Sequence, residues 1–145
     1  MTLEELIAEG ESDELEFKST LRWDIHEGVI NKKLEEVAIN TVAAFANSQG
    51  GTLLIGVDDS GQILGLEHDY STLGGINRDK FEVHLRNIFN QYLGVALVTS
   101  KIQIKFHQLD EKDVCQIEVN PANKTVVVEL KDKNGQSVEV LCSQW

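Results

Sequence analysis

The strongest constraint on the fold is a helical segment that runs almost directly into a buried strand. Residues 30–48 carry apolar side chains at helical spacing, and the second half of this segment is apolar or small on nearly every side. Gly50 and Gly51 stop the helix, because glycine tolerates the left-handed backbone of a helix end. Residues 52–57 follow as a continuous apolar run of strand length, typical of a central strand. The pair predicts a helix packed against a sheet.

The two faces of that helix are predicted from the same spacing. The side chains expected to face the sheet are Ile30, Leu34, Val37, Thr41 and Phe45, and those expected on the outer face are Lys32, Lys33, Glu35 and Glu36.

The remaining patterns complete an α+β order. Thr2 and Glu5 form a capping box that opens a short helix through about Ala8. Further predicted elements are a strand at 15–18, a polar loop at 19–28, a short strand at 62–66, a helix at 80–92, strands at 102–107 and 114–119, and a hairpin from 125–130 and 137–141. The expected fold is a mixed, mainly antiparallel sheet of about five or six strands with two main helices.

The chain of 145 residues is expected to form one domain, residues 1–145, possessing a single core. It has two cysteines, Cys115 and Cys142, and neither is in metal-ligand spacing with a histidine. Both thiols are interpreted as buried residues of a reduced cytoplasm, and the four histidines as isolated polar residues. No secretory signal or membrane span is visible, so we expect a cytoplasmic protein without a membrane partner.

Charge argues against a general attraction to polyanions. The formal net charge is −11, and the first sixteen residues hold seven acidic side chains without a Lys or Arg. The rest of the chain carries 17 acidic against 13 basic residues, and no run of five basic residues occurs. A chain with this mean field should not attract a phosphate backbone non-specifically.

The common nucleotide motifs are absent. Neither a P-loop pattern nor a G-x-G-x-x-G pattern occurs, so ATP and dinucleotide cofactors are not supported. The Gly50-Gly51 pair precedes a strand instead of following one, which favours a helix stop over a phosphate cradle.

One group of carboxylates could carry chemistry. Glu11 and Glu16 flank the first strand, and Asp58 and Asp59 end the central apolar strand. If the two strands are neighbours, these groups meet at one edge and could bind Mg²⁺ or Mn²⁺. Lys18 shares the strand face of Glu16 and could stabilise a developing phosphate charge. On spacing alone, an acidic surface and an Asp-Asp-Ser-Gly turn is the favoured interpretation.

Two longer blocks carry a family resemblance. Residues 11–18, ESDELEFK, look like the E-S-x-x-x-E-F-K signature of the Schlafen-type AlbA-like domain. Residues 43–59, AAFANSQGGTLLIGVDD, resemble that family's A-F-A-N-T-x-G-G-x-L-x-I-G-V-x-D block, and residues 63–66 resemble its I-x-G. The resemblance covers about residues 9–130. One departure is at the end, where the family carries an R-x-G motif and residues 137–145 contain no arginine.

The resemblance implies an α+β domain that handles nucleic acid. Bacterial members are usually described as DNA-binding or transcriptional regulators, whereas some Schlafen proteins are metal-dependent endoribonucleases that cut structured RNA such as tRNA. The catalytic carboxylates of those nucleases match Glu11, Glu16 and Asp58 (or Asp59), and Lys18 matches a lysine near their site.

Three hypotheses of different classes therefore stand. The first is a nucleic-acid-binding module of a regulatory protein, DNA or RNA, for which the candidate phosphate contacts are Lys18, Lys32, Lys33, Lys101 and Lys105. The second is a Mg²⁺- or Mn²⁺-dependent nuclease that cuts RNA or single-stranded DNA through Glu11, Glu16 and Asp58, with Asp59 as a further metal ligand. The third is an interaction or oligomerisation domain, such as a homodimer. The sequence leaves open whether these 145 residues are the whole protein or part of a longer one with additional domains.

Overall fold

The computed structural model of the chain describes residues 2–75, 77–131 and 137–141. Its helices are α1 (Leu3–Glu9), α2 (Lys33–Ala46), α3 (Glu67–Ser71), α4 (Arg78–Leu93) and α5 (Val95–Lys101). Its strands are β1 (Leu15–Lys18), β2 (Trp23–Asp24), β3 (Val29–Ile30), β4 (Gly51–Ile55), β5 (Ile102–Leu109), β6 (Lys112–Val119), β7 (Val127–Lys131) and β8 (Ser137–Leu141).

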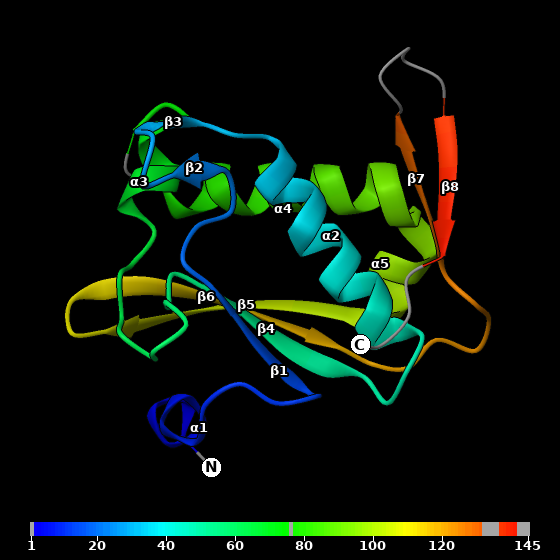
Figure 1. Cartoon of the computed structure of the whole chain (residues 1–145), viewed down its shortest axis with the longest axis horizontal. Helices are drawn as coiled ribbons and strands as arrows, with labels where there is room; N and C mark the ends of the chain where they lie inside the picture. Colours follow the sequence, from blue (N-terminus) through cyan, green and yellow to red (C-terminus); the bar gives the residue numbers. More distant parts are fainter. Residues whose placement is uncertain (1, 76, 132–136, 142–145) are drawn as a thin grey trace.

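The central sheet is mixed and mainly antiparallel. Its order is β1-β4-β6-β5, in which β1 and β4 run parallel and the other neighbours run antiparallel. The predicted α+β class and the two main helices, α2 and α4, are confirmed (Figure 1). The sheet differs from expectation in having four strands, because β7 and β8 pair only with each other beside the helices.

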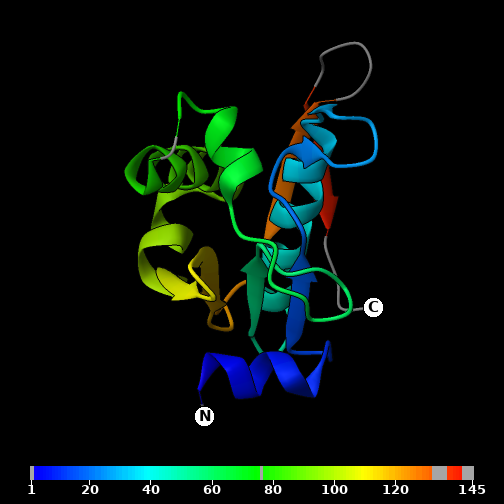
Figure 2. The same cartoon turned by 90° about the vertical axis from the view of Figure 1, so that its left-hand side faces the viewer.

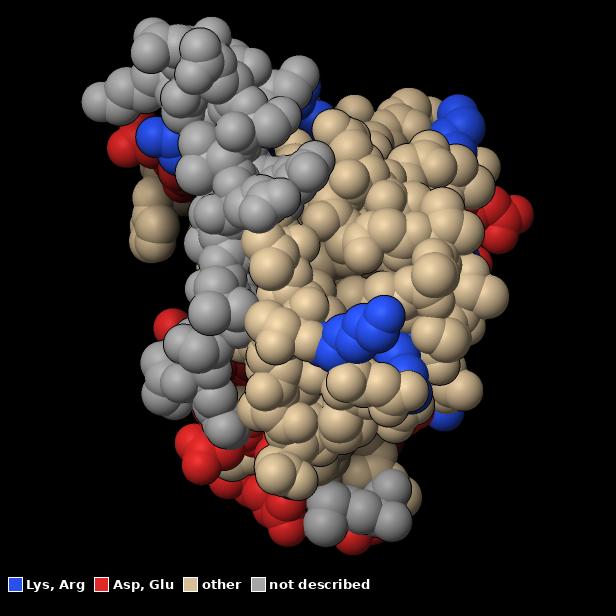
Figure 3. All heavy atoms as spheres, turned by 90° about the vertical axis from the view of Figure 1, so that its right-hand side faces the viewer, with Lys and Arg blue, Asp and Glu red and all other residues tan. Residues whose placement is uncertain are grey.

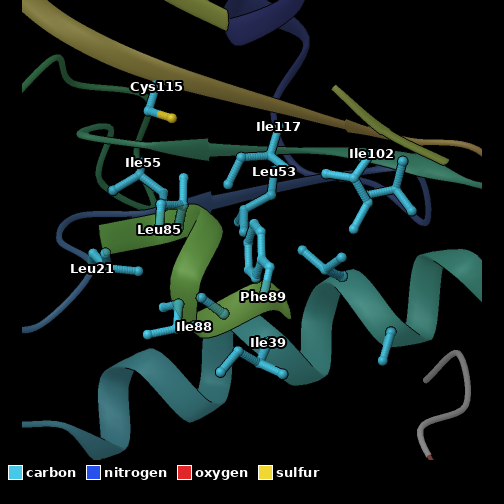
Figure 4. Packing of buried hydrophobic residues seen from close by; sticks show 14 of the residues in the cluster. Leu21, Ile39, Leu53, Ile55, Leu85, Ile88, Phe89, Ile102, Cys115 and Ile117 are labelled. Carbon is cyan, nitrogen blue, oxygen red and sulfur yellow. The ribbon is translucent and has the colours of Figure 1, made fainter. Parts of the chain in front are cut away.

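Apolar side chains fill both faces of this sheet. Figures 1 and 2 show α2 and α4 over one face and α1 over the other. The larger core lies under the two long helices, and Figure 4 shows Leu53, Ile55 and Ile117 of the sheet turned toward Phe89 of α4 and Ile39 of α2. The smaller core contains Ile7 of α1, and its strand members are Leu15, Phe17, Leu54 and Val114. Side chains of alternate residues in β4 therefore point into opposite cores, as the two-residue period of a strand requires.

The glycine pair after α2 ends the helix and permits close packing. Gly50 has φ +83°, and its N–H donates to the carbonyl of Phe45 at 2.9 Å. A Cβ on Gly50 would lie 2.6 Å from the carbonyl oxygen of Val119, and one on Gly51 would lie 2.5 Å from the ring of Phe45. The predicted helix stop is confirmed, and glycine is needed at both positions because neighbouring atoms occupy the space of a side chain.

The predicted faces of α2 are partly wrong. Glu35 is buried, not on the outer face, and Val37 is 42% exposed, not turned to the sheet. Burial of Glu35 follows from the approach of α4, because its carboxylate meets Nε2 of His84 and lies 3.9 Å from Nε of Arg22. His84 is therefore not isolated. The second half of α2 is buried nearly all round, as predicted.

Several short elements were not predicted. The expected loop at 19–28 contains β2 and the turn into β3, and α3 and α5 lie in segments for which no element was predicted. The expected strand at 62–66 is reduced to a single bridge between Val57 and Ile63. Cys115 is buried as expected and burial raises its pKa, whereas Cys142 lies outside the described residues. No helix in the described part of the chain is both long and apolar enough to cross a bilayer.

Candidate functional site

The two sequence blocks form adjacent parallel strands. In the register of β1 and β4, Glu16 pairs with Leu53 and Lys18 pairs with Ile55. The N–H of Gly56 donates to the carbonyl of Lys18 at 2.8 Å, which continues the pairing beyond the end of β1. Because parallel strands end at the same edge, the structure brings Lys18 beside the turn that begins at Asp58.

Glu11 has a structural role at the open edge of β1. One of its carboxylate oxygens accepts a hydrogen bond from the N–H of Phe17 at 2.9 Å. Ser12 and Leu15 form an antiparallel bridge at the same edge. The segment that precedes β1 thus binds the N–H and carbonyl of Leu15 and the N–H of Phe17, and an edge strand covered in this way is less open to pairing with another chain.

Glu16 and Lys18 lie together, as predicted, on one face of β1. The ammonium nitrogen of Lys18 is 3.5 Å from an oxygen of Glu16, and both side chains are partly exposed. Burial raises the pKa of Glu16, the charge of Lys18 lowers it, and the nearby carboxylate of Glu11 raises it further. Glu11 and Glu16 are therefore close enough to interact electrostatically.

Asp58 serves the turn after β4. Its Oδ1 accepts hydrogen bonds from the N–H of Ser60 at 2.9 Å, the hydroxyl of Ser60 at 2.7 Å and the N–H of Gln62 at 2.9 Å. These hydrogen bonds lower the pKa of Asp58, and the bond from the Ser60 hydroxyl has the largest effect. Asp59 is exposed, and it shares a surface hollow with Lys18.

These carboxylates do not form a metal centre in this conformation. Within residues 2–75, 77–131 and 137–141, no three His, Cys, Asp or Glu side chains are arranged to hold an ion. One oxygen of Glu11 and one of Asp58 are already bonded to protein donors. The residues as placed do not fit a metal, so no metal-dependent step is derived, and the metal-ligand assignment stays a prediction.

The candidate phosphate contacts fall into two groups. Lys32 and Lys33 are exposed at the start of α2. Lys101 ends α5, and Lys105 lies on β5 with its ammonium 3.4 Å from Glu118. Strands β1 and β5 are opposite edges of the sheet, so Lys18 is separated from Lys105 by three strand spacings of about 5 Å.

Figure 3 shows one face of the molecule, on which acidic side chains gather along the lower edge and basic side chains form no continuous band.

A hollow opens where β1 leads into β2. It has a volume of about 300 Å³, and the residues that line it are Phe17, Lys18, Ser19, Thr20, Trp23, Asp24, Ile25, His26, Leu34 and Asp59. Trp23 was visible in the sequence only as one residue of a polar loop. No spacing rule marks it, because its position beside Lys18 depends on how residues 19–22 turn.

Buried charges hold this turn in place. Asp69 of α3 is fully buried, and its two oxygens accept the N–H groups of Leu21 at 2.8 Å and Arg22 at 3.0 Å. Burial raises the pKa of Asp69, while the two backbone donors lower it. The Arg22 side chain reaches Glu35, which binds His84. Helices α2, α3 and α4 therefore all fix the segment between β1 and β2.

Comparisons with known proteins identify a family and a fold. The family model described as "Schlafen, AlbA_2" matches residues 11–140. Among solved structures, the DIP2311 protein from Corynebacterium diphtheriae is similar, with a TM-score of 0.57 and 18% sequence identity. The match covers 95% of this chain and 25% of that one, so the chain spans about a quarter of the length of this structural relative. At this identity the likeness supports the fold alone.

Proposed function

The chain belongs to the Schlafen AlbA_2 family, and from that premise we propose that it is a nucleic-acid-binding domain of a regulatory protein. The contact surface that we propose is the hollow at the end of β1, together with the adjoining start of α2. Lys18 supplies a cation inside the hollow, and Lys32 and Lys33 supply cations within two residues of Leu34, which also lines it.

One observation carries this proposal. The pairing of the two family blocks as β1 and β4 places Lys18 in a hollow that also contains Trp23. Phosphate groups are bound by lysine side chains, and unpaired bases are bound by aromatic rings. The two side-chain types that nucleic-acid sites combine thus line one hollow.

The charge distribution limits the kind of contact. Lys101 and Lys105 are too far from the hollow to extend it, and the formal net charge is −11. A long phosphate track is therefore not supported, and we expect a short contact that involves about two or three phosphates.

The test is a salt titration of affinity. Fluorescently labelled single-stranded and duplex oligonucleotides are titrated with the 145-residue chain at several salt concentrations. We expect log Kd to change with log salt with a slope of about 2 to 3, and Lys32→Ala/Lys33→Ala to reduce that slope by about two. The matched control is Lys101→Ala/Lys105→Ala, which removes the same two charges at the other sheet edge and should change little. Absence of binding to every oligonucleotide would refute the proposal.

A metal-dependent nuclease is the second candidate. The observation that favours it is the electrostatic contact between Glu11 and Glu16, which contributes to the raised pKa of Glu16. Two neighbouring carboxylates are a common start of a divalent-cation site, to which Asp58 or Asp59 would add a third.

Labelled tRNA and single-stranded DNA are incubated with the protein in Mn²⁺ and in EDTA. Cleavage that requires Mn²⁺ and is lost in Glu16→Gln supports the nuclease. Cleavage that persists in Glu16→Gln contradicts this site and indicates a contaminating enzyme. A discrete oligomer in sedimentation, without affinity for nucleic acid, supports the interaction domain instead.

A further inference from the structure

The aromatic wall of the hollow is held in one orientation. The ring of Trp23 lies parallel to the imidazole of His68, at 5.8 Å between centroids and 3° between planes. The hydroxyl of Thr20 donates to the carbonyl of Trp23 at 2.5 Å, and the buried carboxylate of Asp69 holds the preceding turn. Figure 1 places β2, which carries Trp23, beside α3 and the start of α2. A ring fixed in this way loses little entropy when a ligand packs against it.

The polar groups of the hollow differ in what they can still bind. Asp24 is occupied, because its Oδ1 accepts the N–H groups of His26 and Glu27, each at 3.0 Å. Asp59 is exposed, and its carboxylate has no hydrogen bond or ion pair with any residue that the structure describes. Lys18 keeps donors free, since an ammonium has three N–H groups and its contact with Glu16 is long at 3.5 Å.

This combination matches one unpaired nucleotide. An indole binds the face of a base, a lysine binds its phosphate, and an aspartate accepts the exocyclic amino group of cytosine. The volume of about 300 Å³ is at the lower end of the range for small-ligand sites. Duplex DNA keeps its bases stacked and cannot place one against Trp23.

Building on the proposed nucleic-acid function, we infer that the hollow is a nucleobase subsite for single-stranded nucleic acid. Trp23 packs against the base, Lys18 contacts the phosphate, and Asp59 favours cytosine over thymine or uracil. Neither the family match nor the structural relative assigns this site to the chain.

The test uses the 145-residue protein and 5′-labelled oligomers of eight deoxycytidines or eight deoxythymidines, read by fluorescence anisotropy. We expect the deoxycytidine oligomer to bind about five-fold or more tightly than the deoxythymidine oligomer, and both to bind more tightly than a duplex of equal length. Trp23→Ala should weaken single-strand binding about ten-fold or more, and Trp23→Phe should retain most of it. Because stacking is not screened, the Trp23→Ala loss should persist at high salt, whereas the effect of Lys18→Ala should shrink.

Asp59→Ala gives a second test that does not depend on the packing of Trp23. The side chain is exposed, so the variant should fold normally, and it should lose the preference for cytosine because the acceptor oxygens are gone. Wild-type affinity in a folded Trp23→Ala variant, a preference for duplex, or a cytosine preference that survives Asp59→Ala would overturn the subsite. If the lysine variants still weaken binding in that case, the nucleic-acid function stands. Absence of binding to every oligomer removes both proposals.

Discussion

At the scale of single residues, three carboxylates predicted to bind a metal have different roles in the structure. Glu11 closes the edge of β1, Asp58 organises a turn, and Glu16 has a pKa that burial raises. Glu11 and Asp58 therefore contribute to the fold, whatever function they also have. Loss of function in a Glu11 variant therefore needs a stability measurement beside it.

The pKa of Glu16 tests the contacts of the site directly. The charge of Lys18 lowers the pKa of Glu16, so we expect this pKa to rise further in Lys18→Met. The carboxylate of Glu11 raises the pKa of Glu16, so we expect this pKa to fall in Glu11→Gln. Since the folded pKa already lies above the unfolded value, the contribution of Glu16 to stability is greatest below the unfolded pKa and is lost as pH rises through the folded one. An NMR titration that follows the side-chain carboxyl carbon of Glu16 measures this pKa in the wild-type protein and in both variants. An unchanged pKa in Glu11→Gln would show that the two carboxylates do not interact.

At the scale of elements, the connection between α2 and β4 requires glycine at position 50 for two reasons, the backbone conformation and the lack of space for a side chain. Gly50 has a positive φ and a blocked Cβ position, whereas Gly28, in the turn between β2 and β3, has a positive φ and open space. Substitutions at these two positions therefore distinguish the free-energy cost of backbone strain from that of a steric clash.

We expect Gly50→Ala to lower the free energy of unfolding by about 2–4 kcal/mol, because strain adds to a contact with the Val119 carbonyl. Gly28→Ala should cost about 1 kcal/mol, since it meets no atom within 4 Å. Urea-induced unfolding followed by circular dichroism measures both. Equal losses would mean that backbone conformation alone requires glycine after α2.

At the scale of the whole molecule, the acidic helix α1 lies on one side of the sheet. It carries Glu4, Glu5 and Glu9 and covers the face opposite α2 and α4 (Figure 2). Glu16 and Lys18 lie on the other face, beside Leu53 and Ile55 in register. Glu4 of α1 lines a second hollow together with Asp59, so the acidic helix can weaken nucleic-acid association at the proposed site through its field.

Neutralising two carboxylates of α1 tests this effect of its field on nucleic-acid association. Glu4→Gln with Glu9→Gln removes two exposed negative charges from a formal net charge of −11. We expect a few-fold gain in affinity for single strands at low salt that disappears at high salt, because the effect is a screened long-range field. Titrations at two ionic strengths measure it. A gain that survives high salt would indicate that these carboxylates touch the ligand.

Much of the fold was predictable because its signals are local. The helix stop at Gly50, the Thr2 cap and the alternation in β1 depend on neighbouring residues, and all three are confirmed. The buried position of Glu35 was not predictable, because a partner on α4, His84, lies 49 residues away in the chain. Likewise, α3 and the β2–β3 pair are too short to have a period.

The sequence by itself determined the family, the α+β class, the helix stop and the adjacency of Glu16 and Lys18, since each follows from local pattern or motif. Only the tertiary structure decided which groups share a surface. It placed Trp23 beside Lys18 and Asp59, separated Lys105 from them, and bound Glu11 and Asp58 to backbone donors. The physical reason is that these contacts join segments distant in the chain, and their geometry depends on how strands pair and helices pack.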